Sequence, residues 1–247
     1  CLPKNKGPFP AAVLVHGSGP HTRNEDLFGH QIFTVIADHL CKQGVAVLRY
    51  DKRGVGASKG IYKTATTLDF ADDAQAAVNF LRLQPQIDAK RVGIVGHSEG
   101  GMIAPIVASR DAQLKFVILM GGPGIAIDQL MLEQVRDAMK AEGALEAGEQ
   151  QAKRYRKVYE LMLAEKDVET LRTKLRELMM SEANAIEKSV QLEIDQLTSP
   201  WFLTFIRFQP QQYLSKLKQP VLAINGELDF QVSAKSNLAG IRQAMKG

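Results

Sequence analysis

Gly96-His97-Ser98-Glu99-Gly100 is a Gly-x-Ser-x-Gly motif that lies between an apolar run, residues 91–95, and a helix-like segment, residues 101–108. This context predicts a strand, a tight turn and a helix. A serine on such a turn projects into solvent, and the turn needs small residues on either side of it. Backbone N–H groups at the helix N-terminus can stabilise a developing oxyanion. The motif therefore predicts that Ser98 is a nucleophile that attacks an acyl carbon.

A serine hydroxyl is a weak nucleophile at neutral pH, so it needs a base, usually an imidazole that a carboxylate holds in place. Asp229 is the candidate carboxylate because it follows the apolar run 221–225, and Asp128 is the alternative. The oxyanion hole is expected to consist of backbone N–H groups, one from Glu99 and one from Ser18 or Gly17. The Glu99 side chain is expected to have a structural role.

The five histidines of the chain are His16, His21, His30, His39 and His97. All of them precede or adjoin Ser98, and none follows Asp229. His97 is expected to point away from the site, and His16 to hydrogen-bond the backbone of its own loop. His21 is the one remote substitute for the base, and it is also a candidate for contact with substrate.

The elements that must position these residues follow from the alternation of apolar runs with amphipathic stretches in the first half of the chain. This alternation is typical of a parallel sheet flanked by helices. Thr67 is the predicted N-cap of the second helix. Residues 23–26 are expected to form a solvated loop, with a place at the entrance to the site as the alternative. The predicted strands are 11–16, 45–50, 91–95, 116–120 and 221–225, and the predicted helices begin near residues 30, 67 and 101.

A long segment separates the fourth and fifth predicted strands. Residues 130–197 are rich in good helix formers and contain no proline, so they predict a helical insertion over the carboxyl edge of the sheet. We divide the chain into a first core part (1–124), a helical cap (125–213) and a second core part (214–247). Trp201 and Phe205, near the end of the cap, either pack it on the core or line an acyl pocket.

Four motifs together resemble those of the α/β-hydrolase superfamily, and in particular serine carboxylesterases with an inserted cap. They are the His16-Gly17 loop, the turn Asp51-Lys52-Arg53-Gly54-Val55-Gly56-Ala57-Ser58, the Ser98 motif and the segment Gly226–Asp229. The resemblance covers residues 11–122 and 219–240. It implies an α/β-hydrolase fold and cleavage of small-molecule carboxylic esters through an acyl-enzyme, with no metal or cofactor. Asp51 and Arg53 are expected to hold loops together by ion pairing.

The resemblance leaves alternatives open. A thioesterase, a peptidase and a catalytically inactive binding protein of the same fold all fit the motifs. In the family the triad ends with a histidine after the last strand, so we expect this chain to be a fragment that lacks the base. A natural chain that has lost its base is the other interpretation. A fragment is expected to expose an apolar sheet edge, through which it could form a homo-oligomer.

Composition excludes some partners. The net charge of +4 comes from 31 basic and 27 acidic residues, and no basic cluster is interleaved with aromatics, so nucleic-acid binding is not expected. No apolar run is long enough to cross a membrane. The two cysteines, Cys1 and Cys41, are expected to be free thiols, with a disulfide between them as the alternative. The compartment, cytoplasmic or periplasmic, stays open.

Overall fold

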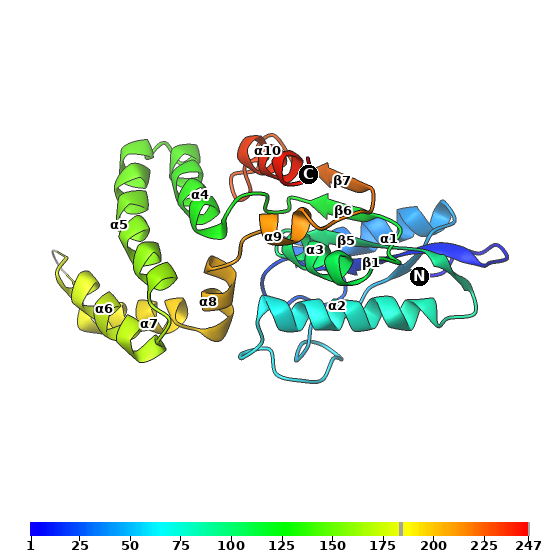
Figure 1. The fold of residues 1–247 in the computed structure, drawn as a ribbon, viewed down its shortest axis with the longest axis horizontal. Helices are drawn as coiled ribbons and strands as arrows, with labels where there is room; N and C mark the ends of the chain where they lie inside the picture. The colour runs from blue at the N-terminus through cyan, green and yellow to red at the C-terminus, as the bar shows by residue number, and fades with distance from the viewer. Residues whose placement is uncertain (183–184, 247) are drawn as a thin grey trace.

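The computed structural model describes residues 1–182 and 185–246. Its centre is a five-stranded sheet with the order β4-β1-β5-β6-β7, in which every neighbouring pair is parallel (Figure 1). A short antiparallel pair, β2 and β3, lies outside this sheet. The strands are β1 Phe9–Val15, β2 Asp26–Leu27, β3 His30–Gln31, β4 Ala46–Leu48, β5 Ile87–His97, β6 Val117–Met120 and β7 Val221–Ile224.

The register of the sheet aligns the carboxyl ends of its central strands. Val15 of β1 pairs with Gly96 of β5, and Met120 of β6 pairs with both His97 and Ile224. The loops that follow these strands therefore meet at one edge, where ligands bind in parallel α/β sheets. That edge brings together Ser98, the loop after His16, and the segment that carries Asp229.

Helices cover the two faces of the sheet unequally. Helices α2 (Thr67–Arg82) and α3 (Gly100–Arg110) pack on one face, and α1 (Ile32–Lys42) packs on the other. Successive side chains of β1 point to opposite faces of the sheet. Val13 belongs to the larger core with α2 and α3, whereas Leu14 packs with α1. Helix α10 (Ala234–Ala244) contacts β7.

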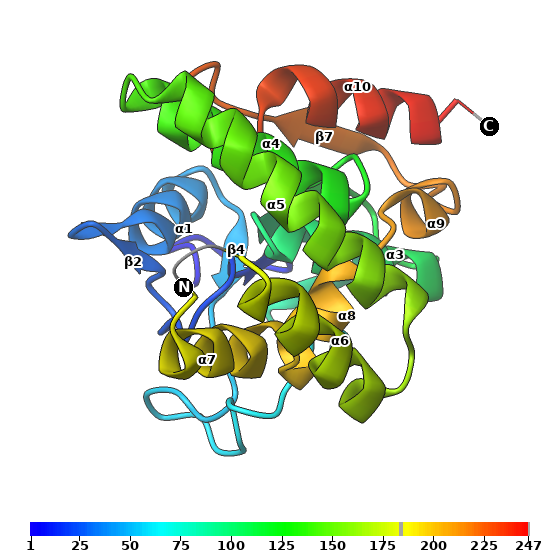
Figure 2. The ribbon, with the colours of Figure 1, turned by 90° about the vertical axis from the view of Figure 1, so that its left-hand side faces the viewer.

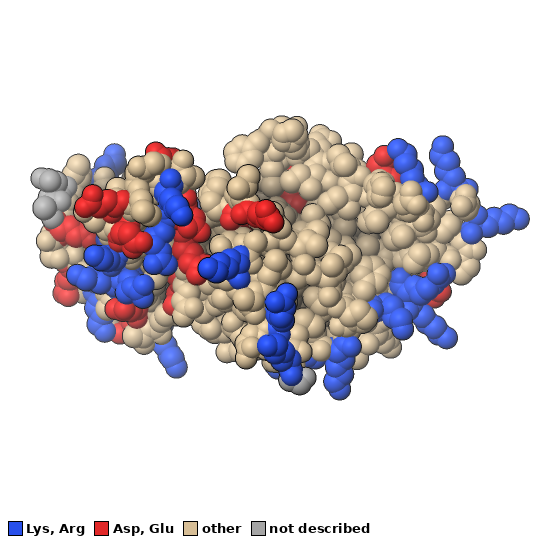
Figure 3. Space-filling model, turned by 90° about the horizontal axis from the view of Figure 1, so that it is seen from above, with Lys and Arg blue, Asp and Glu red and all other residues tan. Residues whose placement is uncertain are grey.

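The segment between β6 and β7 forms the helical cap, which stands beside the core in Figure 1 and faces the viewer in Figure 2. Its own core contains Val158, Met162, Leu171 and Met179, all fully buried. Acidic and basic side chains are interspersed over its surface (Figure 3). The α/β-hydrolase fold with a helical insertion at this position is thus confirmed. The helices are α4 Ile127–Ala141, α5 Leu145–Ala164, α6 Val168–Met180, α7 Glu187–Leu197, α8 Pro200–Ile206 and α9 Gln211–Leu214.

Local details differ from the sequence predictions. The N-cap of α2 is Thr66 rather than Thr67, because Thr66 and Asp69 exchange hydrogen bonds in a capping box. Strand β5 begins at Ile87, earlier than expected, since Ile87 pairs with Phe9 ahead of an irregularity in the ladder.

Cys1 and Cys41 form a disulfide, so the expectation of free thiols was wrong. The backbone explains their proximity. The amino group of Cys1 donates to the Val47 carbonyl at 2.8 Å, and the Val47 N–H donates to the Cys1 carbonyl at 2.9 Å. These bonds hold the N-terminus beside β4, close to the end of α1.

Strand β7 is an edge strand with one solvent-facing apolar side. Leu222 and Ile224 are 53% and 46% exposed, whereas Val221 and Ala223 pack against the larger core. The expected exposed apolar sheet surface is therefore present at β7, and self-association through it stays a prediction. Among the described residues, no helix combines the length and the apolar character needed to span a bilayer.

Candidate active site

Ser98 occupies a strained turn between β5 and α3. Its φ is +52°, in the left-handed region that residues other than glycine rarely adopt. The Ser98 N–H donates to the Met120 carbonyl at 2.9 Å, and the Gly101 N–H donates to the Ser98 carbonyl at 2.7 Å. A Cβ on Gly100 would lie 2.1 Å from the Val15 carbonyl oxygen, and a Cβ on Gly96 would lie 1.9 Å from the Gly100 oxygen. The two glycines are therefore required by close backbone packing.

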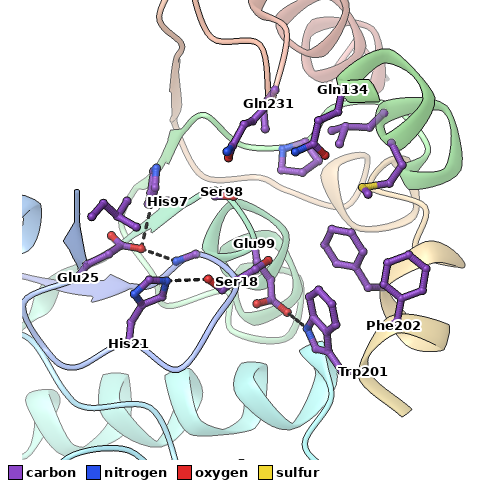
Figure 4. A pocket seen from close by; sticks show the side chains of 17 residues that line it. Ser18, His21, Glu25, His97, Ser98, Glu99, Gln134, Trp201, Phe202 and Gln231 are labelled. Atoms are coloured by element: carbon purple, nitrogen blue, oxygen red, sulfur yellow. Dashed lines mark hydrogen bonds and ion pairs between the residues drawn. The ribbon is translucent and has the colours of Figure 1, made fainter. Parts of the chain in front are cut away.

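A cavity of about 250 Å³ opens above Ser98, and Figure 4 shows the side chains around it. Core loops form one wall, and cap helices α4 and α8 form the other. The lining combines a polar side near the serine with an apolar side from the cap. It consists of Gly17, Ser18, His21, Glu25, Leu27, His97, Ser98, Glu99, Pro123, Leu130, Met131, Gln134, Trp201, Phe202, Phe205, Gln231 and Val232.

The loop after β1 lies against the serine, because a Cβ on Gly17 would be 3.1 Å from the Ser98 Cβ. The Gly17 N–H, however, donates to Glu25 Oε1 at 2.5 Å. Of the two alternatives predicted for this oxyanion donor, Ser18 or Gly17, the Gly17 N–H is therefore already bound to a side chain. Within the described part of the chain, the backbone N–H groups of Ser18 and Glu99 have no hydrogen-bond acceptor.

Glu25 and His97 form a pair beside the serine that the sequence did not predict. Glu25 is fully buried and has a φ of +47°, so the expectation of a solvated loop was wrong at this residue. Its Oε1 is 3.0 Å from Nδ1 of His97, which lines the pocket instead of pointing away from it (Figure 4). The Glu25 N–H donates to the Thr22 carbonyl at 3.0 Å, which closes the turn that carries the carboxylate inward.

The Glu99 carboxylate is buried beneath the pocket and receives three donors. Lys52 Nζ donates to Oε2 at 3.2 Å, and Thr67 Oγ1 and Trp201 Nε1 each donate to Oε1 at 2.8 Å. Lys52 also donates to the Gly17 carbonyl at 2.7 Å. Burial lowers the pKa of Lys52, while the neighbouring Glu99 charge opposes that shift. The Glu99 side chain thus supports the structure around Ser98.

Lys52→Met is expected to lower the free energy of unfolding by about 3 kcal/mol, since it leaves the buried Glu99 carboxylate without a cation. Denaturant unfolding measures the change. The exposed Lys63→Met variant is the matched control, with an expected change within about 0.5 kcal/mol. Adding Glu99→Gln to Lys52→Met should recover part of the loss. Equal denaturant midpoints for Lys52→Met and Lys63→Met would refute the claim that the Lys52–Glu99 ion pair stabilises the fold.

Trp201 and Phe205 lie where the cap meets the core, and both line the cavity at Ser98. They belong to α8, stack with ring centroids 4.9 Å apart and line the pocket. The bond from Trp201 to Glu99 also joins the cap to the core directly. Contact of either residue with substrate remains a proposal.

His16 is fully buried, and neither ring nitrogen has a hydrogen-bond partner in the described structure. The expectation that it hydrogen-bonds the loop backbone was therefore wrong. Aromatic packing holds it instead, with ring centroids 5.3 Å from Phe33 and 5.2 Å from Tyr50. Burial lowers the pKa of His16 from 6.5 to about 4.

The lowered pKa of His16 predicts that the folded protein loses stability in acid. Between pH 6.5 and about 4 the unfolded chain binds a proton at His16 that the folded chain does not. Stability should therefore fall across this window as the pH drops, by about 3 kcal/mol in total. Denaturant unfolding at several pH values should show a smaller fall for His16→Phe. The His39→Gln variant, which replaces an exposed histidine, should show the same pH dependence as the unsubstituted chain. If His16→Phe also showed that same pH dependence, His16 would not be the cause of the acid sensitivity.

Asp229 lies at the same sheet edge, on the loop after β7. Its Oδ1 accepts the N–H groups of Gln231 and Val232, each at 2.9 Å. Its Oδ2 faces Gly121, where an added Cβ would be 3.4 Å away. The alternative acid, Asp128, is in the first turn of α4, and neither Asp229 nor Asp128 is among the residues that line the cavity at Ser98.

None of the five histidines, all of which the structure describes, hydrogen-bonds Ser98 or Asp229. His21 lines the pocket, and its Nε2 is 2.6 Å from the Ser18 carbonyl oxygen. His30 and His39 are exposed on β3 and α1.

The turn after β4 holds loops together, as expected. Arg23 donates to both carboxylate oxygens of Asp51, at 3.0 and 2.8 Å, and this hydrogen bonding is the main cause that lowers the Asp51 pKa. Arg53 makes two 2.7 Å bonds to Asp73 on α2.

A parallel sheet with helices on both faces, a cap between β6 and β7, and a strained serine turn at the carboxyl edge define an α/β hydrolase. The family model described as serine aminopeptidase, S33, matches residues 8–244. The chain belongs to this hydrolase family.

Relatives and solved structures agree with this class. Esterase EstD of Thermotoga maritima is 36% identical over 135 residues, which are 55% of this chain and 32% of that protein. Thiohydrolase apmlB of Arthrinium phaeospermum is 32% identical over 76 residues, which are 30% of this chain and 25% of that protein. The crystal structure of the α/β hydrolase GrgF from Penicillium sp. sh18 superposes with a TM-score of 0.62 at 16% identity, covering 99% of this chain and 80% of that one. The chain thus spans about a third or less of these two curated relatives.

Proposed function

We propose that the protein is a serine hydrolase that cleaves carboxylic esters through an acyl-enzyme, with Ser98 as the nucleophile and Asp229 as the acid. The observation that carries the proposal is the Ser98 turn, whose positive φ presents the serine to a cavity beside two unpaired backbone N–H groups. This is the arrangement that acyl transfer requires. The similarity to an esterase supports the choice of ester substrates.

The reaction would proceed in two steps. Ser98 Oγ attacks the ester carbonyl carbon while an imidazole accepts its proton, and the N–H groups of Ser18 and Glu99 stabilise the resulting oxyanion. Collapse of this intermediate expels the alcohol, which takes the proton from the imidazole. Water, deprotonated by the same imidazole, then attacks the acyl-enzyme and releases the acid and Ser98.

The base is an imidazole that reaches both Ser98 and the free Oδ2 of Asp229. No described histidine is bonded to either residue, so the experiment below tests whether residues 1–247 supply the base. Thioesters and peptides are alternative substrates for the same site, in line with the names of a relative and of the family.

Hydrolysis of p-nitrophenyl butyrate by the full gene product and by residues 1–247 tests the proposal, with a fluorophosphonate probe to locate the reactive serine by peptide mass spectrometry. Turnover by the full product, with the probe on Ser98, is the expected result. Turnover by residues 1–247 alone would show that these residues supply the base and would make His21 the next residue to replace. A folded full product that neither turns over nor reacts with the probe would favour a binding protein. Matched oxygen esters and thioesters rank the two substrate classes.

A further inference from the structure

A second, larger cavity of about 660 Å³ lies between helices of the cap and is open to solvent on one side. Its wall comes from helices α4, α5, α7 and α8, so the cap alone forms it. Its lining is predominantly apolar and aromatic, and includes Met131, Val135, Tyr155, Tyr159, Trp201 and Phe202.

The two cavities share part of their walls. Met131, Trp201 and Phe202 line both the cavity at Ser98 and the cavity in the cap. Trp201 is held by its bond to Glu99, whereas Met131 is an unbranched, flexible side chain that can move aside. The cap cavity is therefore adjacent to the site of the proposed reaction, and these side chains form the wall between the two.

The charges around the cap cavity select a neutral occupant. Glu193, on its wall, is already paired with Arg154 through bonds of 2.8 and 2.9 Å, and Asp195 is paired with Arg172. The described lining includes no lysine, arginine or histidine that could bind an anion. Burial increases from the exposed Leu192 to the buried Tyr159 and Leu197, so the apolar floor is the part most shielded from water.

We propose that the cap cavity binds the apolar chain of an ester whose carbonyl lies at Ser98, so that the protein prefers esters with chains longer than butyl. This inference rests on the proposed function for the position of the carbonyl. The bound alkyl chain is on either the acyl or the alcohol side of the ester, since both sides present the same alkyl chemistry to the cavity.

Trp201 is the only tryptophan in the 247-residue chain, and it borders both cavities, so its fluorescence reports binding without any turnover. We expect Ser98→Ala to bind methyl decanoate more tightly than methyl butanoate, by about fourfold for each added CH₂ that is buried, the factor given by about 0.8 kcal/mol. Nonyl acetate, an isomer of methyl decanoate, carries its long chain on the alcohol side. Whichever of the two isomers binds more tightly shows whether the cavity takes the alkyl chain of the acyl side or of the alcohol side.

Val135→Phe, which fills the cap cavity, should weaken binding of the longer ester at least tenfold and leave methyl butanoate unchanged. Val168→Phe is the matched control, because Val168 is exposed on α6 and does not line the cavity. Equal affinities for short and long esters, or equal losses for both in Val135→Phe, would overturn the inference even if esters are hydrolysed. Chain-length-dependent binding without Ser98-dependent turnover in the full product would support the apolar site and refute the proposed function.

Discussion

Ser98→Ala in the full gene product is expected to lower kcat for p-nitrophenyl butyrate by a factor on the order of 10³ to 10⁶, with little change in KM. The hydroxyl is the only group of Ser98 that the reaction uses, and the alanine keeps the backbone of the strained turn. The backbone donors of Ser18 and Glu99 also remain, so the residual rate reflects binding and oxyanion stabilisation alone. Initial rates over a range of ester concentrations give both constants.

Ser18→Ala is the matched control for this experiment. We expect Ser18 to act through its backbone N–H, which alanine retains, so kcat should change by less than about threefold, a change of under 1 kcal/mol in the barrier. Residual activity above a tenth in Ser98→Ala would remove Ser98 as the nucleophile. A large loss in Ser18→Ala would show instead that its hydroxyl takes part.

Gly100→Ala is expected to lower the free energy of unfolding by at least about 3 kcal/mol. The added Cβ would lie 2.1 Å from the Val15 carbonyl oxygen and 2.9 Å from that of His16. Both atoms belong to the backbone at the end of the central strand β1, so no side chain can turn away to relieve the collision. Strand β1 and helix α3 would have to separate.

Gly226→Ala is the control, because its Cβ would meet nothing nearer than the Asp229 Cβ at 4.0 Å. Thermal and denaturant unfolding of the two variants should differ widely. If Gly100→Ala unfolded at the same denaturant concentration as Gly226→Ala, the close contact between the serine turn and β1 would be wrong.

The sheet and the serine turn could be predicted because their signals are local. The buried part of each inner parallel strand is a continuous apolar run, and Ser98 is marked by glycines two residues away on either side. The cap was predictable as helical from its composition, although the cavity inside it depends on how α4, α5, α7 and α8 pack.

The pairs that support the site depend on the fold and were therefore missed. Glu25 binds a backbone N–H, which has no sequence signature, and its partner His97 is 72 residues away. The direction of His97 depends on where β5 ends relative to β6. Cys1 and Cys41 are 40 residues apart and meet only because the N-terminus lies beside β4.

Two buried side chains hold Gly17 on both sides, Glu25 at its N–H and Lys52 at its carbonyl. Releasing either bond would leave a buried polar group of the Gly17 backbone without that partner. The loop is thus a fixed part of the protein, and adaptation to new substrates falls to helices α4 and α8. In recombination between homologues, Glu25, Lys52 and Glu99 should be inherited as one unit, whereas the cap can be exchanged or randomised around Trp201.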